Sequence, residues 1–180
     1  MFILASASPA RAELLKRYRF QVVPSGVREV RRKTLRDTCI ANAKLKAETV
    51  AKKHPDTWVL AADTLVELGG KLYGKPRDKK AALKLLQTLS GKTHTLGTGV
   101  VLQKNAFQIV KFVTSQVTFR QDPPIEKLLR SYDPTRFAGG YAIKEKDDPL
   151  VERVDGSVSN VIGLPMETIE PLLRNLNGQT

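Results

Sequence analysis

The apolar positions of the chain fall into short continuous runs and longer stretches with helical spacing. Residues 2–5 and 58–62 are apolar without alternation, which is typical of short buried strands, whereas the apolar residues of 34–53 share one helix face. The same reading predicts strands at 20–24, 65–68, 71–73, 93–103 and 107–119, helices at 78–89, 124–132 and 165–176, and a hairpin within 142–154. Strands and helices mix without strict alternation, so we expect an α/β fold with a mixed, strongly twisted sheet flanked by helices.

The first strand runs directly into the start of a helix, in the stretch LASASPARAELL. Ser8 can cap that helix and proline suits its first position. The helix N-terminus would bring free N–H groups to the place where Ser6, Ser8 and Arg11 gather, which indicates a site for an anion such as phosphate. A plain strand–turn–helix with a good cap explains the stretch equally well.

Asp63 is the most informative carboxylate in the chain. It follows the apolar run 59–62, and we expect the strand to end at this residue. A carboxylate with apolar residues on both sides is costly unless it has a partner or a function. The alternatives to a functional role are a helix cap or a buried ion pair with a lysine.

Composition limits the possible classes of protein. The 180 residues suit one domain, and 41% hydrophobic residues are enough for a core. No apolar run approaches the ~20 residues of a membrane span, and the first residues lack the layout of a signal peptide. One cysteine, Cys39, excludes an intrachain disulfide and fits a reducing compartment, so we expect a cytoplasmic protein. Two histidines and one cysteine are too few for a convincing zinc site.

The formal net charge of +12 has two readings. It could serve nucleic-acid binding, but the basic residues are spread along the whole chain, and the densest run, VREVRRK, has no aromatic residues to stack on bases. A basic surface around a pocket for a small polyanion explains the charge equally well, so a nucleic-acid partner is the less favoured reading.

Polar residues at the breaks between predicted elements suggest one reaction. Arg11, Lys44 and Lys75 could neutralise linked phosphates, and Glu29 and Asp63 could supply oxygen ligands for a divalent metal. This combination suits hydrolysis of a phosphoanhydride, in which positioning and charge neutralisation carry most of the catalysis. For each lysine taken singly, a solvated surface position is the commoner fate.

One further turn could contribute to a pocket. The pair Gly139-Gly140 permits close approach of the backbone or a positive φ, which would suit a base or ribose site, or a tight bend between core elements. Tyr141 could stack on a base, although core packing is the commoner fate of such a residue. His94 lies between two threonines of a predicted strand and is interpreted as structural.

Several separated motifs, taken in order, resemble the Maf family of nucleoside triphosphate pyrophosphatases. The motifs are LASASPARAELL, IANAKLKA, AADTLVELGGKLYGKPRD, LSGKTHTLGTGV, AGGYAI and LVERVDGSVSNVIGLP, and they span almost the whole chain. The resemblance implies one domain over residues 1–180, with two lobes around a central cleft and a fold related to the inosine-triphosphate pyrophosphatases. It also implies hydrolysis of nucleoside triphosphates to the monophosphate and pyrophosphate, and a homodimer.

The resemblance assigns roles to individual residues. The proton acceptor falls on Asp63, and magnesium or manganese would be held by Glu29 and Asp63. The phosphate-binding residues that it implies are Ser8, Arg11, Lys44 and Lys75. We add Ser6, because it lies in the same loop as Ser8.

Three positions bear on the choice of base. Thr64 favours the branch that acts on thymidine and uridine triphosphates, whereas Ala10 and Lys144 depart from both described branches of the family. These departures keep one alternative open, a regulatory, septum-formation-inhibitor-type member that binds nucleotide without hydrolysis. The net charge of +12 keeps open a second, a nucleic-acid-binding protein.

Overall fold

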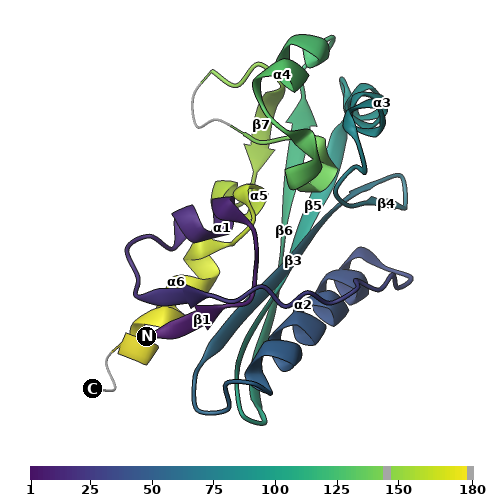
Figure 1. Cartoon of the computed structure of the whole chain (residues 1–180). Coiled ribbons are helices and arrows are strands. Elements are labelled where there is room, and N and C mark those ends of the chain that lie inside the picture. The colour runs from purple at the N-terminus through teal and green to yellow at the C-terminus, as the bar shows by residue number, and fades with distance from the viewer. Residues whose placement is uncertain (144–146, 178–180) are drawn as a thin grey trace.

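A mixed seven-strand sheet carries helices on both faces, as Figure 1 shows for this computed structural model. The structure describes residues 1–143 and 147–177. The strand order is β2-β1-β3-β5-β6-β7, and β4 pairs separately with β3. The strands are β1 (Phe2–Leu4), β2 (Phe20–Val22), β3 (Val59–Leu68), β4 (Lys71–Tyr73), β5 (Thr93–Lys104), β6 (Phe107–Phe119) and β7 (Val151–Asp155). The predicted α/β class and the mixed sheet are confirmed.

The pairing of β3 leaves part of one strand edge open. Along one edge, β5 pairs with β3 antiparallel from Val59 to Glu67. On the other edge, the parallel strand β1 pairs only with Val59 and Leu60, and the antiparallel strand β4 pairs only from Val66 to Leu68. Residues 61–65 therefore have no neighbouring strand on that edge in the described part of the chain.

The helices are distributed between the two faces and the two ends of the sheet. Helix α2 (Leu35–Ala51) packs on one face with Ala61 and Val101, and on the other face α6 (Met166–Asn177) packs with Leu60 and Leu102. Figure 1 shows α3 (Lys79–Leu89) and α4 (Ile125–Ser131) at one end of the long strands, whereas α1 (Pro9–Leu14) and α6 lie along one side of them. The remaining short helices are η1 (Pro134–Arg136), η2 (Ala138–Gly140) and α5 (Val158–Ile162).

Helix α2 lies very close to β5 because the strand carries a glycine beneath it. A Cβ atom at Gly99 would lie 2.6 Å from the backbone carbonyl of Cys39, which no side chain could occupy. Cys39 itself is fully buried in the core. This close approach brings the polar face of α2 down to β3, where Asp63 pairs in register with Gly99.

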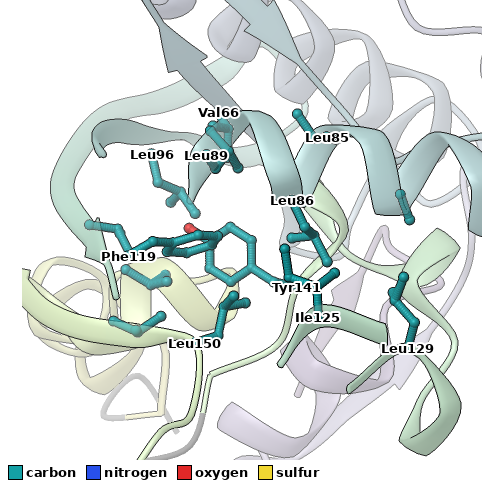
Figure 2. Packing of buried hydrophobic residues seen from close by; sticks show 14 residues of the cluster. Val66, Leu85, Leu86, Leu89, Leu96, Phe119, Ile125, Leu129, Tyr141 and Leu150 are labelled. Carbon is teal, nitrogen blue, oxygen red and sulfur yellow. The ribbon is translucent and has the colours of Figure 1, made fainter. Parts of the chain in front are cut away.

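A second apolar cluster fills the end of the molecule around α3 and α4. Figure 2 shows Phe119 and Tyr141 among leucines from α3, β5 and the segment before β7. The two rings meet edge to face with centroids 4.9 Å apart, and His94 packs edge to face on both of them. His94 is buried and its Nε2 lies 2.8 Å from the Tyr141 hydroxyl, which agrees with a structural role.

The predicted elements are largely confirmed, with three corrections. Strand β3 does not end at Asp63 but continues to Leu68, because the carboxylate finds partners on α2 and the apolar pair that follows can stay in the sheet. The hairpin expected within 142–154 is wrong for the described residues, where a single strand, β7, pairs with β6 instead. Helix α5 was not predicted. None of the helices in the described ranges has the length and apolar character needed to cross a membrane.

Candidate active site

A cleft of about 600 Å³ opens at the unpaired edge of β3. Its walls come from the loop after β1, the loop at 24–31, α2, β3, the turn at Gly74-Lys75, the η1–η2 segment and the end of α5. Neither β1 nor β4 covers residues 61–65 of β3. The backbone and side chains of this part of the strand can therefore contact a ligand in the cleft.

Two carboxylates share one lysine in this cleft. The ammonium of Lys46 lies 2.7 Å from Oε1 of Glu29 and 2.6 Å from Oδ1 of Asp63. The side chains of Lys46 and Asp63 are only 12% and 5% exposed, whereas that of Glu29 is 54% exposed. The Lys46–Asp63 pair is thus held largely away from solvent, while Glu29 faces the open part of the cleft.

The loop that carries Glu29 is fixed to α2 by polar side chains four residues apart. Asn42 donates to Oδ2 of Asp63 (3.0 Å) and to the Val30 carbonyl (3.1 Å), and its amide oxygen accepts from the Val30 N–H (2.8 Å). The Thr38 hydroxyl accepts from the backbone N–H of Arg32 (3.0 Å). This spacing places Thr38, Asn42 and Lys46 on one face of the helix, so the face that holds the loop also holds Asp63.

The lysine of α2 that lines the cleft is therefore Lys46 and not Lys44. Lys44 is two residues from both Asn42 and Lys46, roughly 200° around the helix from each, and it does not line the cleft. The four-residue spacing of Thr38, Asn42 and Lys46 was the sequence feature that could have identified the correct lysine.

Burial and the neighbouring charges shift the pKa values of this group. Burial raises the pKa of Asp63, Lys46 opposes that rise, and the negative charge of Glu29 adds to it. Partial burial alone would raise the pKa of Glu29, but the hydrogen bond and charge of Lys46 outweigh it, so that the pKa is lowered. Burial and then the cations Arg11 and Lys46 lower the pKa of Lys75, which lines the same cleft.

Arg11 is buried and bridges separate parts of the chain. Its guanidinium donates to the carbonyls of Gly163 (3.0 Å) and Ala62 (2.9 Å) and to the hydroxyls of Ser6 (3.1 Å) and Thr64 (3.0 Å). These bonds engage four of the five N–H donors of an arginine. Burial lowers the pKa of Arg11, while Asp63 and Glu29 favour its charged form. Arg11 thus joins the first loop, the open edge of β3 and the end of α5.

The other predicted residues divide clearly by location. The following line the cleft: Ser6, Ser8, Arg11, Glu29, Asp63, Thr64 and Lys75. Ser8 also caps α1, as predicted, accepting from the Arg11 N–H at 3.5 Å. Ala10 is on α1 outside the cleft, and Lys144 falls outside the described residues.

The donor set of the cleft suits a metal that arrives with a ligand. Among the residues that the structure describes, no three histidine, cysteine or carboxylate side chains form a cluster that could hold a metal. Glu29 and Asp63 provide two carboxylates through their shared contact with Lys46. Magnesium commonly binds through one or two carboxylates together with substrate phosphates, so these two residues fit that mode of binding.

Comparison with known proteins identifies the family. The family model described as Maf-like protein matches residues 1–176. Among curated relatives, a dTTP/UTP pyrophosphatase of Myxococcus xanthus is 42% identical over 97% of this chain and 92% of its own length. Proteins of the same name from Pyrococcus furiosus and Latilactobacillus sakei are 40% and 39% identical, over 95% and 97% of this chain and 93% and 100% of their own lengths. With its cleft at the open edge of β3, the chain belongs to the Maf family.

Proposed function

We propose that this protein is a nucleotide pyrophosphatase that converts nucleoside triphosphates to the monophosphate and pyrophosphate, with dTTP and UTP as its preferred substrates. The observation that carries the proposal is the Glu29–Lys46–Asp63 arrangement, which lies in the cleft and combines a buried base with a cation. The names of the relatives support the choice of substrate, since three of them are dTTP/UTP pyrophosphatases.

The reaction requires Asp63 in its charged form. Lys46 lies against its carboxylate and favours that form, while Asn42 fixes the second oxygen. Asp63 accepts a proton from water as the water oxygen forms a bond to the α-phosphorus. The bond between that phosphorus and the bridging oxygen breaks, and its electron pair leaves with pyrophosphate. General-base assistance of this kind contributes about 10²–10⁴-fold to the rate.

The cleft supplies further groups for the charged end of the substrate. Lys75 lines the same cleft as Lys46 and lies close enough for the two charges to interact, so both cations can neutralise a bound triphosphate. The Ser6 and Ser8 hydroxyls lie at the end of β1 beside the same space. Arg11 acts mainly by holding this loop against β3, because its guanidinium is already bonded to protein oxygens.

Magnesium or manganese would be held by Glu29 and Asp63 together with the substrate. Such an ion supplies a positive charge that stabilises the charge developing on the phosphate oxygens. Lys46 lies between the two carboxylates, so an ion would bind there only if the ammonium group moved toward the phosphates of a nucleotide. Metal binding and nucleotide binding are therefore coupled in this proposal.

The test is product analysis with a panel of nucleotides. The purified chain is incubated with Mg²⁺ and with dTTP, UTP, CTP, dATP and GTP, and the products are separated by anion-exchange chromatography. We expect equal amounts of monophosphate and pyrophosphate, with the highest kcat/KM for dTTP and UTP. Release of orthophosphate with a nucleoside diphosphate would contradict the reaction. Binding of nucleotides without any hydrolysis would instead identify a regulatory member of the family.

A further inference from the structure

The open edge of β3 divides the cleft into two parts with different chemistry. Successive side chains of a strand point to opposite faces, so Asp63 faces α2 while Thr64 faces the other side of the sheet. There the Thr64 hydroxyl meets that of Thr98 at 3.0 Å and accepts from Arg11. The charged group with Lys46 therefore lies on one side of the strand, and Thr64 lies on the other.

Two apolar segments border the Thr64 side of the cleft. Arg11 bonds both Thr64 and the Gly163 carbonyl, which brings the end of α5, with Ile162, to this side. From the opposite direction, Gly139 packs on Val66, the next residue of β3 on the same face, so closely that a Cβ atom would lie 2.9 Å from its Cγ2. The Gly139 N–H also donates to the Gly74 carbonyl at 3.0 Å, which fixes the η1–η2 segment over the strand.

Two aromatic residues line the described part of the cleft, and only one of them is available to a ligand. Tyr141 is 4% exposed, and its ring and hydroxyl are engaged by Phe119 and His94 in the core of Figure 2. Phe137 is half-buried and lines the cleft. The sequence suggested Tyr141 as a residue that could stack on a base. In the structure Phe137 is the aromatic residue available for this role.

Phe137 is held in place before any ligand binds. Its N–H donates to the Pro134 carbonyl at 3.3 Å, and its carbonyl accepts from the Gly140 N–H at 3.0 Å. Its ring meets that of Tyr132 edge to face with centroids 5.7 Å apart, and the Tyr132 hydroxyl donates to the Gly140 carbonyl at 3.0 Å. A ring fixed in this way loses little conformational freedom when a flat ligand packs against it.

We propose that the apolar side of the cleft, formed by Phe137, Ala138 and Ile162, binds the nucleobase, and that Phe137 is the residue on which the base stacks. This assignment rests on the proposed function, since it takes the triphosphate to lie at Asp63 and Lys46. The sugar then crosses the edge of β3, and the base lies beside Thr64. Every base has a π face, so Phe137 provides affinity for the base in general, whereas polar neighbours such as Thr64 select among bases.

The test compares ligands with and without a base in two variants of Phe137. Phe137→Ala removes the ring, and Phe137→Leu keeps apolar volume but has no π face. Phe107→Ala is the matched control, because Phe107 is 59% exposed at the β5–β6 turn and does not line the cleft. For each protein, KM for UTP and the inhibition constant of inorganic tripolyphosphate are measured with Mg²⁺, and circular dichroism verifies the fold.

We expect Phe137→Ala to raise KM for UTP by about 5- to 100-fold, the factor that stacking of one base on an aromatic ring typically provides. The inhibition constant of tripolyphosphate should stay unchanged, and Phe137→Leu should fall between the wild type and Phe137→Ala. An unchanged KM for UTP overturns the proposal. So does an equal rise for both ligands, because Phe137 would then support the phosphate end or the fold.

The same variants separate this proposal from the proposed reaction. Dissociation constants for UTP and tripolyphosphate are measured by isothermal titration calorimetry, which needs no turnover. Loss of UTP affinity in Phe137→Ala with unchanged tripolyphosphate affinity supports the base site even when the wild type hydrolyses nothing. Hydrolysis by the wild type with equal UTP affinity in all variants supports the reaction and rejects the base site.

Discussion

Asp63, in the middle of strand β3, and Lys46, on helix α2, form an ion pair of 2.6 Å although they are 17 positions apart in the sequence. Both side chains are largely buried, so removing the two charges from water costs free energy. A buried ion pair is therefore weak evidence of a role in stabilising the fold. Its location beside the open edge of β3 gives it access to a ligand. The pair thus places a cation and a carboxylate in the cleft, where Lys46 could bind a triphosphate and Asp63 could bind a metal.

Asp63→Asn should abolish turnover while leaving the protein folded. The asparagine keeps the size of the side chain but cannot accept the proton of the attacking water, so we expect kcat to fall by about 10²–10⁴-fold. The thermal midpoint should change little, because Lys46 keeps its ion pair with Glu29 and is not left as an unpaired buried charge. Steady-state kinetics and thermal denaturation check the two expectations. An asparagine variant with wild-type kcat would exclude Asp63 as the base.

The two lysines of α2 provide a matched comparison. Lys46→Met should lower kcat by about 10²-fold, as removal of one preorganised donor typically does. Lys44→Met should leave kcat and KM close to the wild-type values, because Lys44 is turned away from the cleft. Circular dichroism verifies that both variants are folded. The assignment of Lys46 fails if the two substitutions have equal effects on turnover.

Lys46 should also compete with a metal ion for the two carboxylates. In the absence of nucleotide, Lys46→Met is expected to bind Mn²⁺ at least about ten-fold more tightly than the wild type, because Glu29 and Asp63 no longer neutralise an ammonium group. Electron paramagnetic resonance of free Mn²⁺ measures the affinity without turnover. Adding Asp63→Asn to the same variant should remove the gain. Equal Mn²⁺ affinity in the wild type and Lys46→Met would show that the carboxylates do not form the metal site.

Local sequence features predicted most of the elements but not the environment of the site. Ser8, Thr34 and Asp78 cap the helices that they were expected to begin. The continuation of β3 through Asp63 could not be predicted, because the partners of the carboxylate lie 17 and 21 residues away on α2. Propensity and spacing describe neighbours along the chain, whereas this strand is stabilised by contacts across the fold.

The site residues show the same limit. A loop beside a helix N-terminus indicated that Arg11 faces an anion, and Arg11 does line the cleft. The local pattern did not predict that its guanidinium also donates to carbonyls and hydroxyls of four other residues. Those acceptors include Gly163, which is 152 positions away. The cleft itself depends on β1 and β4 pairing with different parts of one edge of β3. No local pattern in the sequence describes that arrangement.

Arg11→Lys should destabilise the fold even though it keeps the charge. A lysine cannot reproduce the planar fork that reaches the first loop, β3 and the end of α5 at once. We expect a loss of about 2 kcal/mol or more and a fall of several degrees in the thermal midpoint. Arg17→Lys is the control, since Arg17 is exposed and contacts Glu170 only at 3.7 Å. A variant that loses activity with an unchanged midpoint would make Arg11 a substrate ligand instead of a bridge within the protein.

His94 should make the stability of the protein sensitive to mild acid. Burial lowers the pKa of His94 from 6.5 to about 4, so between these pH values the unfolded chain binds a proton that the folded protein excludes. The free energy of unfolding therefore falls as the pH is lowered through this window, by up to about 3 kcal/mol. His94→Gln should flatten this part of the profile in urea denaturation, because glutamine can partner Tyr141 without titrating. Tyr141→Phe leaves the histidine in place and should retain the slope; equal slopes in the wild type and His94→Gln would show that another group carries the effect.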